Sequence, residues 1–432
     1  DNKGTPSMAE TPASPEKSEK KKKLSFAALR HPGCRVYLIG AALAMMADNI
    51  EHVISYWIIF QKFHSPALGG FAIVAHWLPF LLFSVYSGAL ADRFDPRRII
   101  QIGMGLFIIA STGWGVLFFT DSLEMWHAAL LLVIHGLAGV LWSPAAQLLV
   151  HHMVGGDNLQ SAIRLMAISR NLGQLFGPAI GAALLLSLGS AMGIIVNALI
   201  YLPLLIWLIA APYGPQFSEG AKIVRRGVKG FGEIFDAIRG ISSNYNIVAM
   251  VLLAGGTSMF VGNAHSAQMP EFAADLGAGK TGILYSILLA ANAAGALIGG
   301  IILETRGWLQ PKPRTAIFMG GLWAIALGGF AITGNYVVAV ALIFIAGFLN
   351  LSFSAMAQTL TQLEAPPEIR GRVIGLYNMS NNGLRTFSGV TVGIGGGAIG
   401  IHWSLGLSAV ALVVFIAGLM VYSNRPQAVP AE

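Results

Sequence analysis

Residues 88–97 read Gly88-Ala89-Leu90-Ala91-Asp92-Arg93-Phe94-Asp95-Pro96-Arg97 and lie between two long apolar runs. This stretch joins a glycine, a carboxylate and two arginines in one tight turn. A degraded copy follows about 212 residues later: Gly300-Ile301-Ile302-Leu303-Glu304, with Arg306, Lys312 and Arg314 after it. A charged hairpin that recurs at half the chain length, between apolar runs, is typical of a duplicated membrane transporter.

The composition supports a membrane protein. Of the 432 residues, 55% are hydrophobic and 11% are charged, whereas about 25% are charged in a typical soluble domain. The hydrophobic residues cluster in runs of about 20, the length at which a helix crosses roughly 30 Å of hydrocarbon. Strand-like alternation is absent, which argues against a membrane barrel. The single cysteine, Cys34, excludes a disulfide framework and a thiolate metal cluster.

The apolar runs predict an all-α protein with twelve transmembrane helices in two pseudo-symmetric six-helix bundles. The first bundle occupies 35–211, with spans at 35–61, 68–91, 98–119, 125–150, 160–188 and 190–211. The second occupies 246–423, with spans at 246–270, 280–303, 315–334, 336–363, 373–400 and 403–423. A disordered cytoplasmic tail is expected over 1–34 and a short tail over 424–432. Residues 212–245 form a basic connector, in which 221–241 has the spacing of an amphipathic helix at the membrane surface.

The charge distribution predicts the topology. The net charge is +7, but the basic residues occupy short loops between apolar runs, which argues against nucleic acid as a partner. Nearly all of them fall in loops on one side, counted from the tail. The positive-inside rule therefore places both termini in the cytoplasm.

The two halves repeat beyond the hairpin. The segment Trp142-Ser143-Pro144-Ala145-Ala146-Gln147 aligns with Phe353-Ser354-Ala355-Met356-Ala357-Gln358, and Ile168-Ser169-Arg170-Asn171 aligns with Met379-Ser380-Asn381-Asn382. Both matches have an offset close to that of the hairpin and fall at equivalent positions of equivalent spans. Two parallel repeats of six spans explain them.

On these residues the sequence resembles the major facilitator superfamily. The family signature between helices 2 and 3 is matched by Gly88, Leu90, Asp92, Arg93 and Arg97, while Asp95 and Pro96 depart from it. The variant resembles the bacterial subgroup of siderophore and drug exporters, which implies a multi-pass protein of the bacterial inner membrane. The stretch 173–181 resembles the antiporter motif of helix 5 through Gly173, Gly177, Pro178 and Gly181. Many such exporters carry an arginine on helix 4, where this chain has Ile134-His135-Gly136.

The charged hairpin is a candidate gating motif, comprising Gly88, Asp92, Arg93, Arg97 and, in the second copy, Glu304. A carboxylate at this point can accept hydrogen bonds from the N-terminus of a neighbouring helix, where the dipole favours negative charge. The resemblance implies a cytoplasmic latch that holds the outward-open state. The alternative is a positive-inside anchor that does not switch.

Helix 1 carries the candidate proton-coupling group, Asp48, Glu51 and His52, to which we add Arg170 of helix 5. Asp48 and His52 share one helix face at i, i+4 spacing. A central aspartate costs about 2.5–3.5 kcal/mol to insert into a bilayer, so these groups should face a cavity or a partner. A carboxylate–histidine pair can carry a proton near neutral pH. Asp48 and His52 can equally bind a divalent metal, or the group can be a structural plug between helices.

Other polar residues inside the spans are candidate substrate contacts: Gln174, Asn263, His265, Asn292, Asn381, Asn382 and Arg385. An arginine this deep needs an acceptor, and Asp48, Glu51 or an anionic substrate would serve for Arg170. Interhelical hydrogen bonding is the rival interpretation. His76 and His135 are isolated in apolar surroundings, and we interpret them as interior residues rather than ligands.

Together these patterns predict a secondary active transporter, and not an enzyme. It would act as a monomer in the lipid bilayer, by alternating access and without a cofactor, and would export an amphipathic drug-like or siderophore-like molecule driven by protons. No nucleotide-binding loop is present in the sequence. Export of a divalent, iron-like metal through Asp48 and His52, transport of a lysolipid, and a non-transporting scaffold or sensor are the alternatives.

Overall fold

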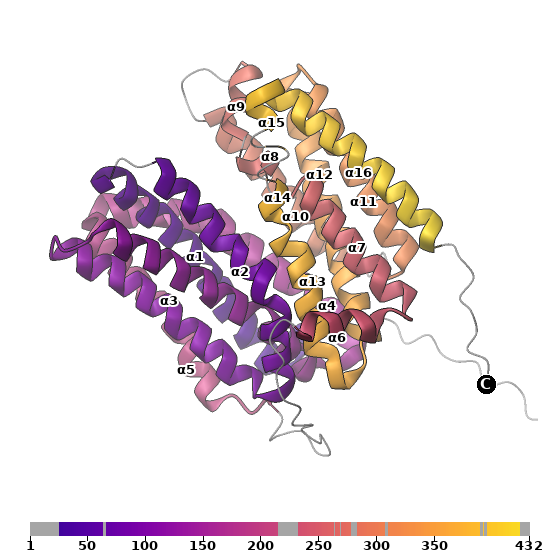
Figure 1. Cartoon of the computed structure of the whole chain (residues 1–432), viewed down its shortest axis with the longest axis horizontal. Helices are drawn as coiled ribbons and strands as arrows, with labels where there is room; N and C mark the ends of the chain where they lie inside the picture. Colours follow the sequence, from indigo (N-terminus) through magenta and orange to yellow (C-terminus); the bar gives the residue numbers. More distant parts are fainter. Residues whose placement is uncertain are drawn as a thin grey trace, which may run out of the picture.

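The computed structural model describes residues 26–63, 66–214, 232–262, 264–267, 269–277, 283–306, 310–388, 392 and 395–423. Every regular element in these ranges is a helix (Figure 1). Pro178 lies in a described helix, although its side chain is outside the description, and Asn263 lies outside the described residues altogether.

The first half begins with a 3-10 turn and continues through five helices. These are η1 (Ala27–Arg30), α1 (Pro32–Phe63), α2 (Pro66–Arg93), α3 (Pro96–Phe119), α4 (Met125–Ile200) and α5 (Leu202–Ala210). Asp95 caps α3, because its Oδ1 accepts a hydrogen bond from the backbone N–H of Arg97 at 3.0 Å and Pro96 occupies the first helical position. α4 is kinked at Gly155 and Gly189, with φ of 66° and 77°. The kinks divide it into spans four, five and six, the last of which α5 completes.

The second half is built from more and shorter helices. These are α6 (Gly232–Ile241), α7 (Tyr245–Phe260), α8 (Ala264–Ala267), α9 (Met269–Asp275), α10 (Ile283–Arg306), α11 (Pro313–Ile332), α12 (Tyr336–Glu364), η3 (Pro367–Ile369), α13 (Arg370–Asn378), the π-helical turn η4 (Met379–Gly383), α14 (Arg385–Ser388), α15 (Gly395–Ile399) and α16 (Ile401–Ser423). The helices α7 to α9 follow one another along span seven, and α13 to α15 along span eleven.

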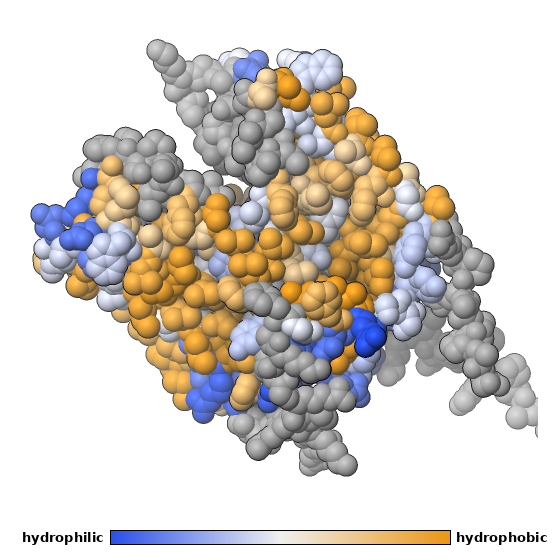
Figure 2. All heavy atoms as spheres, in the orientation of Figure 1, coloured by the Kyte–Doolittle hydropathy of each residue, from blue (hydrophilic) through white to orange (hydrophobic). Residues whose placement is uncertain are grey.

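Seven helical stretches of the described residues are individually long and apolar enough to cross a membrane. They hold eight spans, because the stretch Met125–Gly181 contains two spans, one before and one after Gly155. α1, α10, α7–α9 and α13–α15 complete six spans in each half, which confirms the predicted fold class. Apolar side chains cover the flanks of both bundles and polar ones gather at their ends (Figure 2), as a bilayer requires.

α6 lies across the ends of the helices and not along them (Figure 1). Glu233, Ala237 and Ile241 are buried, and Phe235 and Ile238 are exposed. The amphipathic surface helix predicted over 221–241 stays a prediction, because its first part, 221–231, falls outside the described residues.

Candidate functional site

The charged hairpin joins the two halves. At the end of α2, Asp92 Oδ1 accepts from the backbone N–H of Gly371 at 2.5 Å, and Oδ2 accepts from that of Arg372 at 2.9 Å. Both donors belong to the first turn of α13, where the helix dipole favours a carboxylate. A Cβ at Gly88 would lie 2.0 Å from the Gly371 carbonyl oxygen, so only glycine permits this approach. The sequence predicted a contact with a helix N-terminus, and the structure identifies the helix.

The second copy makes the corresponding contact in the opposite direction. At the end of α10, Glu304 accepts a hydrogen bond from Ser161 Oγ and lies 3.7 Å from Arg164 Nη1, both on α4. Arg164 also donates to the Leu303 carbonyl at 2.9 Å. Ser161 stands about 211 residues before Arg372, the offset of the repeat. Each half therefore places the acidic residue of its hairpin against the equivalent helix of the other half.

Further contacts belong to the same end of the molecule. Gln147 Nε2 donates to Asn378 Oδ1, and Gln362 Nε2 donates to Gln147 Oε1, each at 3.0 Å. Arg372 Nη1 donates to Glu233 of α6 at 3.1 Å, which ties the connector to the hairpin. We call this the latch end. From it the two halves diverge towards the opposite end (Figure 1).

The remaining gating residues act within one half. Arg97 is buried, pairs with Asp95 at 2.5 Å and donates to the Ala211 carbonyl, all in the first bundle. Arg93, the last residue of α2, makes no hydrogen bond or ion pair with the other half among the described residues. Among the gating residues, Asp92 and Glu304 therefore supply hydrogen bonds that join the two halves.

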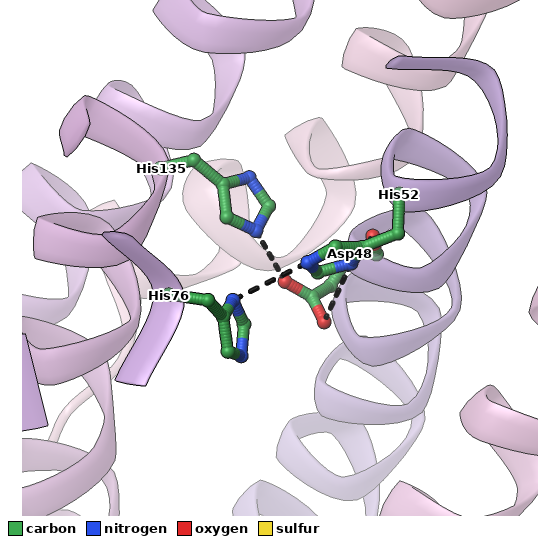
Figure 3. A group of neighbouring side chains, drawn as sticks. All are labelled: Asp48, His52, His76 and His135. Carbon is green, nitrogen blue, oxygen red and sulfur yellow. Dashed lines mark hydrogen bonds and ion pairs between the residues drawn. The ribbon is translucent and has the colours of Figure 1, made fainter. Parts of the chain in front are cut away.

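A buried cluster of titratable side chains lies inside the first bundle (Figure 3). Asp48 and His52 come from α1, His76 from α2 and His135 from α4. His135 Nε2 lies 2.9 Å from Asp48 Oδ1, His52 Nδ1 lies 3.8 Å from Asp48 Oδ2, and His52 Nε2 lies 3.3 Å from His76 Nδ1. We call these four residues the histidine cluster.

Glu51 extends the cluster to a second carboxylate. Its Oε1 lies 2.9 Å from His135 Nδ1, and its Oε2 accepts a hydrogen bond from Ser111 of α3. Asn197 then donates to Ser111 Oγ at 3.2 Å and to the Ala47 carbonyl at 2.9 Å. Glu51 is 2% exposed, so its charge is compensated by these partners and not by water.

The two carboxylates beside His135 favour the protonated form of its ring. Both of its nitrogens lie 2.9 Å from carboxylate oxygens, but only Nδ1 makes a hydrogen bond, to Glu51 Oε1, whereas Nε2 faces Asp48 Oδ1 without hydrogen-bond geometry. When both nitrogens carry protons, the ring is an imidazolium between two carboxylates. Loss of either proton would weaken the attraction to one of them.

The glycines of the fifth span, which lie in α4, hold α1 in position for the cluster. A Cβ at Gly173 would lie 2.8 Å from Met45 Cβ, and one at Gly177 would lie 2.5 Å from Asn49 Cβ. Gly181 continues this stripe towards Ile50 at a looser 3.3 Å. This close approach supports the packing role expected for these residues, with Asp48 and Glu51 held on the other faces of α1.

His76 and His135 lie inside the bundle as expected, but they are not isolated. They supply half of the histidine cluster, and His135 holds the two carboxylates together. A signal was present in the sequence, because His135 falls where the resemblance would place a helix 4 arginine. Ser111 and Asn197 carried no such signal, since a lone serine or asparagine in an apolar span commonly bonds its own backbone.

Among the described residues no ion pair joins Arg170 to Asp48 or Glu51; Arg170 is exposed on α4, as is Gln174. Asn292 is half-buried on α10, and His265 is buried beside Trp323. Asn381 and Asn382 lie in η4, where the Asn381 carbonyl accepts from Ser258 Oγ at 2.5 Å. A π-helical turn is a frequent feature of functional sites.

Arg385 connects the second half to the histidine cluster. Its guanidinium lies 5.0 Å from the ring centroid of Trp77 on α2, in cation–π geometry, and its Nε donates to the Asn381 carbonyl at 3.0 Å. Trp77 in turn packs edge-on against His76, with ring centroids 4.5 Å apart. A chain of contacts thus runs from the second bundle to the first-bundle cluster.

Comparison with known proteins agrees with this geometry. The family model of the Major Facilitator Superfamily matches residues 37–389. The chain belongs to the Major Facilitator Superfamily. It is therefore a multi-pass membrane transporter and not an enzyme, as the sequence predicted.

Its relatives include exporters. Macrolide efflux protein A of Streptococcus pyogenes is 24% identical over 344 residues, which cover 78% of this chain and 82% of the relative. Enterobactin exporter EntS of Salmonella typhimurium is 24% identical over 357 residues, which cover 81% of this chain and 82% of the relative. The predicted resemblance to siderophore and drug exporters is confirmed.

Solved structures share the fold. The E. coli fucose:proton symporter FucP matches with a TM-score of 0.70 at 11% identity, covering 91% of this chain and 98% of that one. The human organic anion transporter MFSD10 matches with a TM-score of 0.70 at 12% identity, and the match covers 91% of this chain and 99% of that one. At these identities the likeness concerns the fold alone.

Proposed function

We propose that this transporter exports an amphipathic small molecule by alternating access, driven by protons. The observation that carries the proposal is the buried group of Asp48, Glu51 and His135, in which one imidazole bridges two carboxylates at 2.9 Å on each side. Buried charges inside a membrane-spanning bundle are costly to keep and mark ion pathways. His52 and His76 extend the group and would relay the proton.

The proposed proton path would open at His52. A small cavity, with room for about one water molecule, is lined by Glu51, His52, Ser55, Ala72, His76, Leu132 and His135. Glu51 is nearly fully buried, whereas the His52 side chain is 22% exposed. The proton would enter at His52 and move inward to Asp48, His135 and Glu51.

The latch end would be the cytoplasmic gate. With both termini in the cytoplasm, as loop charge predicts, the closed latch end makes the described state outward-open. Protonation of the cluster would alter the contacts of α1 and α2, and the Trp77–Arg385 contact would transmit this change to the second half. The protein would work as a monomer in the bacterial inner membrane.

An anionic or partly anionic substrate suits the free charge at the substrate contacts. Arg170 is exposed on α4 and forms no ion pair with Asp48 or Glu51 among the described residues, so an anionic group of the substrate could reach it. Arg385 contributes a second cation from the other half. The macrolide efflux protein and the enterobactin exporter among the relatives support a drug-like or siderophore-like substrate. Gln174, Asn263, Asn292, Asn381 and Asn382 would supply neutral contacts.

The test is flux in proteoliposomes. A panel of amphipathic dyes, a macrolide, a siderophore and divalent metals is first screened with and without a pH gradient to find a transported compound. Asp48→Asn should then abolish gradient-driven flux of that compound while the protein elutes and melts as the wild type does. Asp121→Asn, in an exposed loop, is the matched control and should transport normally. Undiminished flux in Asp48→Asn would remove Asp48 from the coupling mechanism.

A further inference from the structure

The histidine cluster has the ligands of a transition-metal site. We propose that Asp48, His52, His76 and His135 bind one divalent ion of the zinc and cobalt class. Each residue offers one donor atom, and all four donor atoms lie within 4.8 Å of one another. Three imidazoles and one carboxylate suit zinc, cobalt or iron and not magnesium or calcium, which prefer oxygen ligands.

The distances between donors fit a tetrahedral centre. Metal–ligand bonds of about 2.0–2.1 Å place neighbouring donors about 3.3 Å apart around a tetrahedral ion. His52 Nε2 and His76 Nδ1 are separated by 3.3 Å, and His135 Nε2 and Asp48 Oδ1 by 2.9 Å. Two opposite edges of the tetrahedron are therefore already close to their final length. The longer separations close by small rotations of His52 and His76, which are half-buried.

The outer contacts orient the ligands as in known metal sites. A ligating histidine usually donates its other ring N–H to a carboxylate or a backbone carbonyl, which fixes its tautomer. His52 Nδ1 donates to the Asp48 carbonyl at 2.7 Å, and His135 Nδ1 donates to Glu51 Oε1 at 2.9 Å. Both Nε2 atoms are thereby directed into the cluster (Figure 3). Glu51 is itself held by Ser111, so the support extends one residue further.

Charge and surroundings favour a bound ion. The two positive charges of the metal match the two carboxylates Asp48 and Glu51, so the occupied cluster is neutral when His135 Nε2 has given its proton to solvent. Phe107 packs on His135 with centroids 4.9 Å apart, and Trp77 packs on His76. These rings limit water access, which strengthens the binding of an ion to its ligands.

All four ligands come from α1, α2 and α4 of the first bundle. A movement of one half against the other leaves their mutual distances unchanged, so the site would persist in every conformational state, and ion binding would compete with protons for the same nitrogen atoms. The proposal concerns binding alone and does not rest on the proposed cargo or on proton coupling.

The test is a Co²⁺ titration of the purified, EDTA-stripped protein in detergent, followed by visible absorption. The wild type should bind one Co²⁺ per chain and develop the intense visible bands of a tetrahedral ion. His52→Gln and His76→Gln should each lose the bands and weaken binding more than tenfold. Two variants are used so that the result survives if one misfolds. Glu51→Gln, which removes only the outer support of His135, should weaken binding about 10–100-fold.

The control is His402→Gln. His402 lies in the second half, where it contacts Asp275 and the Ala331 carbonyl, and its replacement should leave the titration unchanged. The proposal is overturned if the wild type gives no tetrahedral spectrum, or if His52→Gln and His76→Gln titrate like the control. Neither result depends on flux, so failure here is distinguishable from failure of the proposed function.

Discussion

Replacement of Asp92 should open the latch end. Its carboxylate accepts two backbone hydrogen bonds, from Gly371 and Arg372, and lies 3.6 Å from Arg372 Nε. The side chain is 9% exposed, so water replaces these bonds poorly while the latch is closed. Asp92→Ala removes both bonds and the charge at the N-terminus of α13 without adding bulk.

The size of the effect follows from these contacts. A hydrogen bond to a charged group contributes about 1.5–3 kcal/mol, so two such bonds amount to about 3–6 kcal/mol. The second latch at Glu304 stays intact and the freed N–H groups become hydrated once the halves part, so we take the lower limit. About 3 kcal/mol corresponds to a roughly 150-fold shift of the closed–open ratio towards the open state.

Cysteine labelling measures this shift. The only native cysteine, Cys34, is buried and is first replaced by serine. Ser84→Cys then supplies the reporter, because Ser84 is fully buried and its carbonyl faces Gly375 of α13 across the two halves. Maleimide reaches this thiol only when the latch end opens. Asp92→Ala should raise the labelling rate on the order of 100-fold.

The matched control is Asp95→Ala. Asp95 lies in the same hairpin and also caps a helix, but its side-chain hydrogen bonds among the described residues go to Arg97 of the same half. Its removal should change the labelling rate no more than about twofold, since the hydrogen bonds between the halves remain. Equal labelling of Asp92→Ala and the parent, or an equal rise in Asp95→Ala, would refute the assignment of Asp92 as a residue that holds the latch end closed.

Two further variants test packing and substrate charge. Gly177→Ala should lower the melting temperature, with a destabilisation of about 1–3 kcal/mol, because the new Cβ would lie 2.5 Å from Asn49 Cβ. The control Gly418→Ala, whose Cβ would have nothing within 4 Å, should melt at or above the wild-type temperature. Equal melting temperatures of the two variants would contradict the packing argument. Arg170→Gln should raise the apparent KM for an anionic substrate about 10–100-fold through loss of a charged hydrogen bond. The control Arg98→Gln should leave the KM unchanged, since Arg98 contacts Gln101 at 3.1 Å. A KM that Arg170→Gln does not affect would exclude an anion contact at Arg170.

Much of the fold was predictable because its signals are local. The length of an apolar run determines whether a helix can cross a bilayer, and the positive-φ glycines Gly155 and Gly189 break α4 close to the predicted span limits. The recurrence of Gly88 and Asp92 as Gly300 and Glu304 indicated the duplication. None of these inferences requires knowledge of which helices are neighbours.

The sites depended on which helix faces meet, and the sequence carries little information about that. A spanning helix is apolar on most of its circumference, because lipid and protein neighbours both accept apolar side chains. His76 therefore carried no sign that it faces Asp48, the sign at His135 came only from the family resemblance, and Asp92 carried none that its donors lie 279 and 280 positions further along the chain.

The sequence alone determined that this chain spans a membrane twelve times as two related halves, and that charged groups lie where lipid cannot solvate them. Only the tertiary structure decided which groups compensate those charges. Close contact with Gly173, Gly177 and Gly181 of α4 sets the rotation and depth of α1. This rotation brings Asp48 and Glu51 to His135. Such contacts join residues far apart in sequence, so their energies arise only when the helices pack.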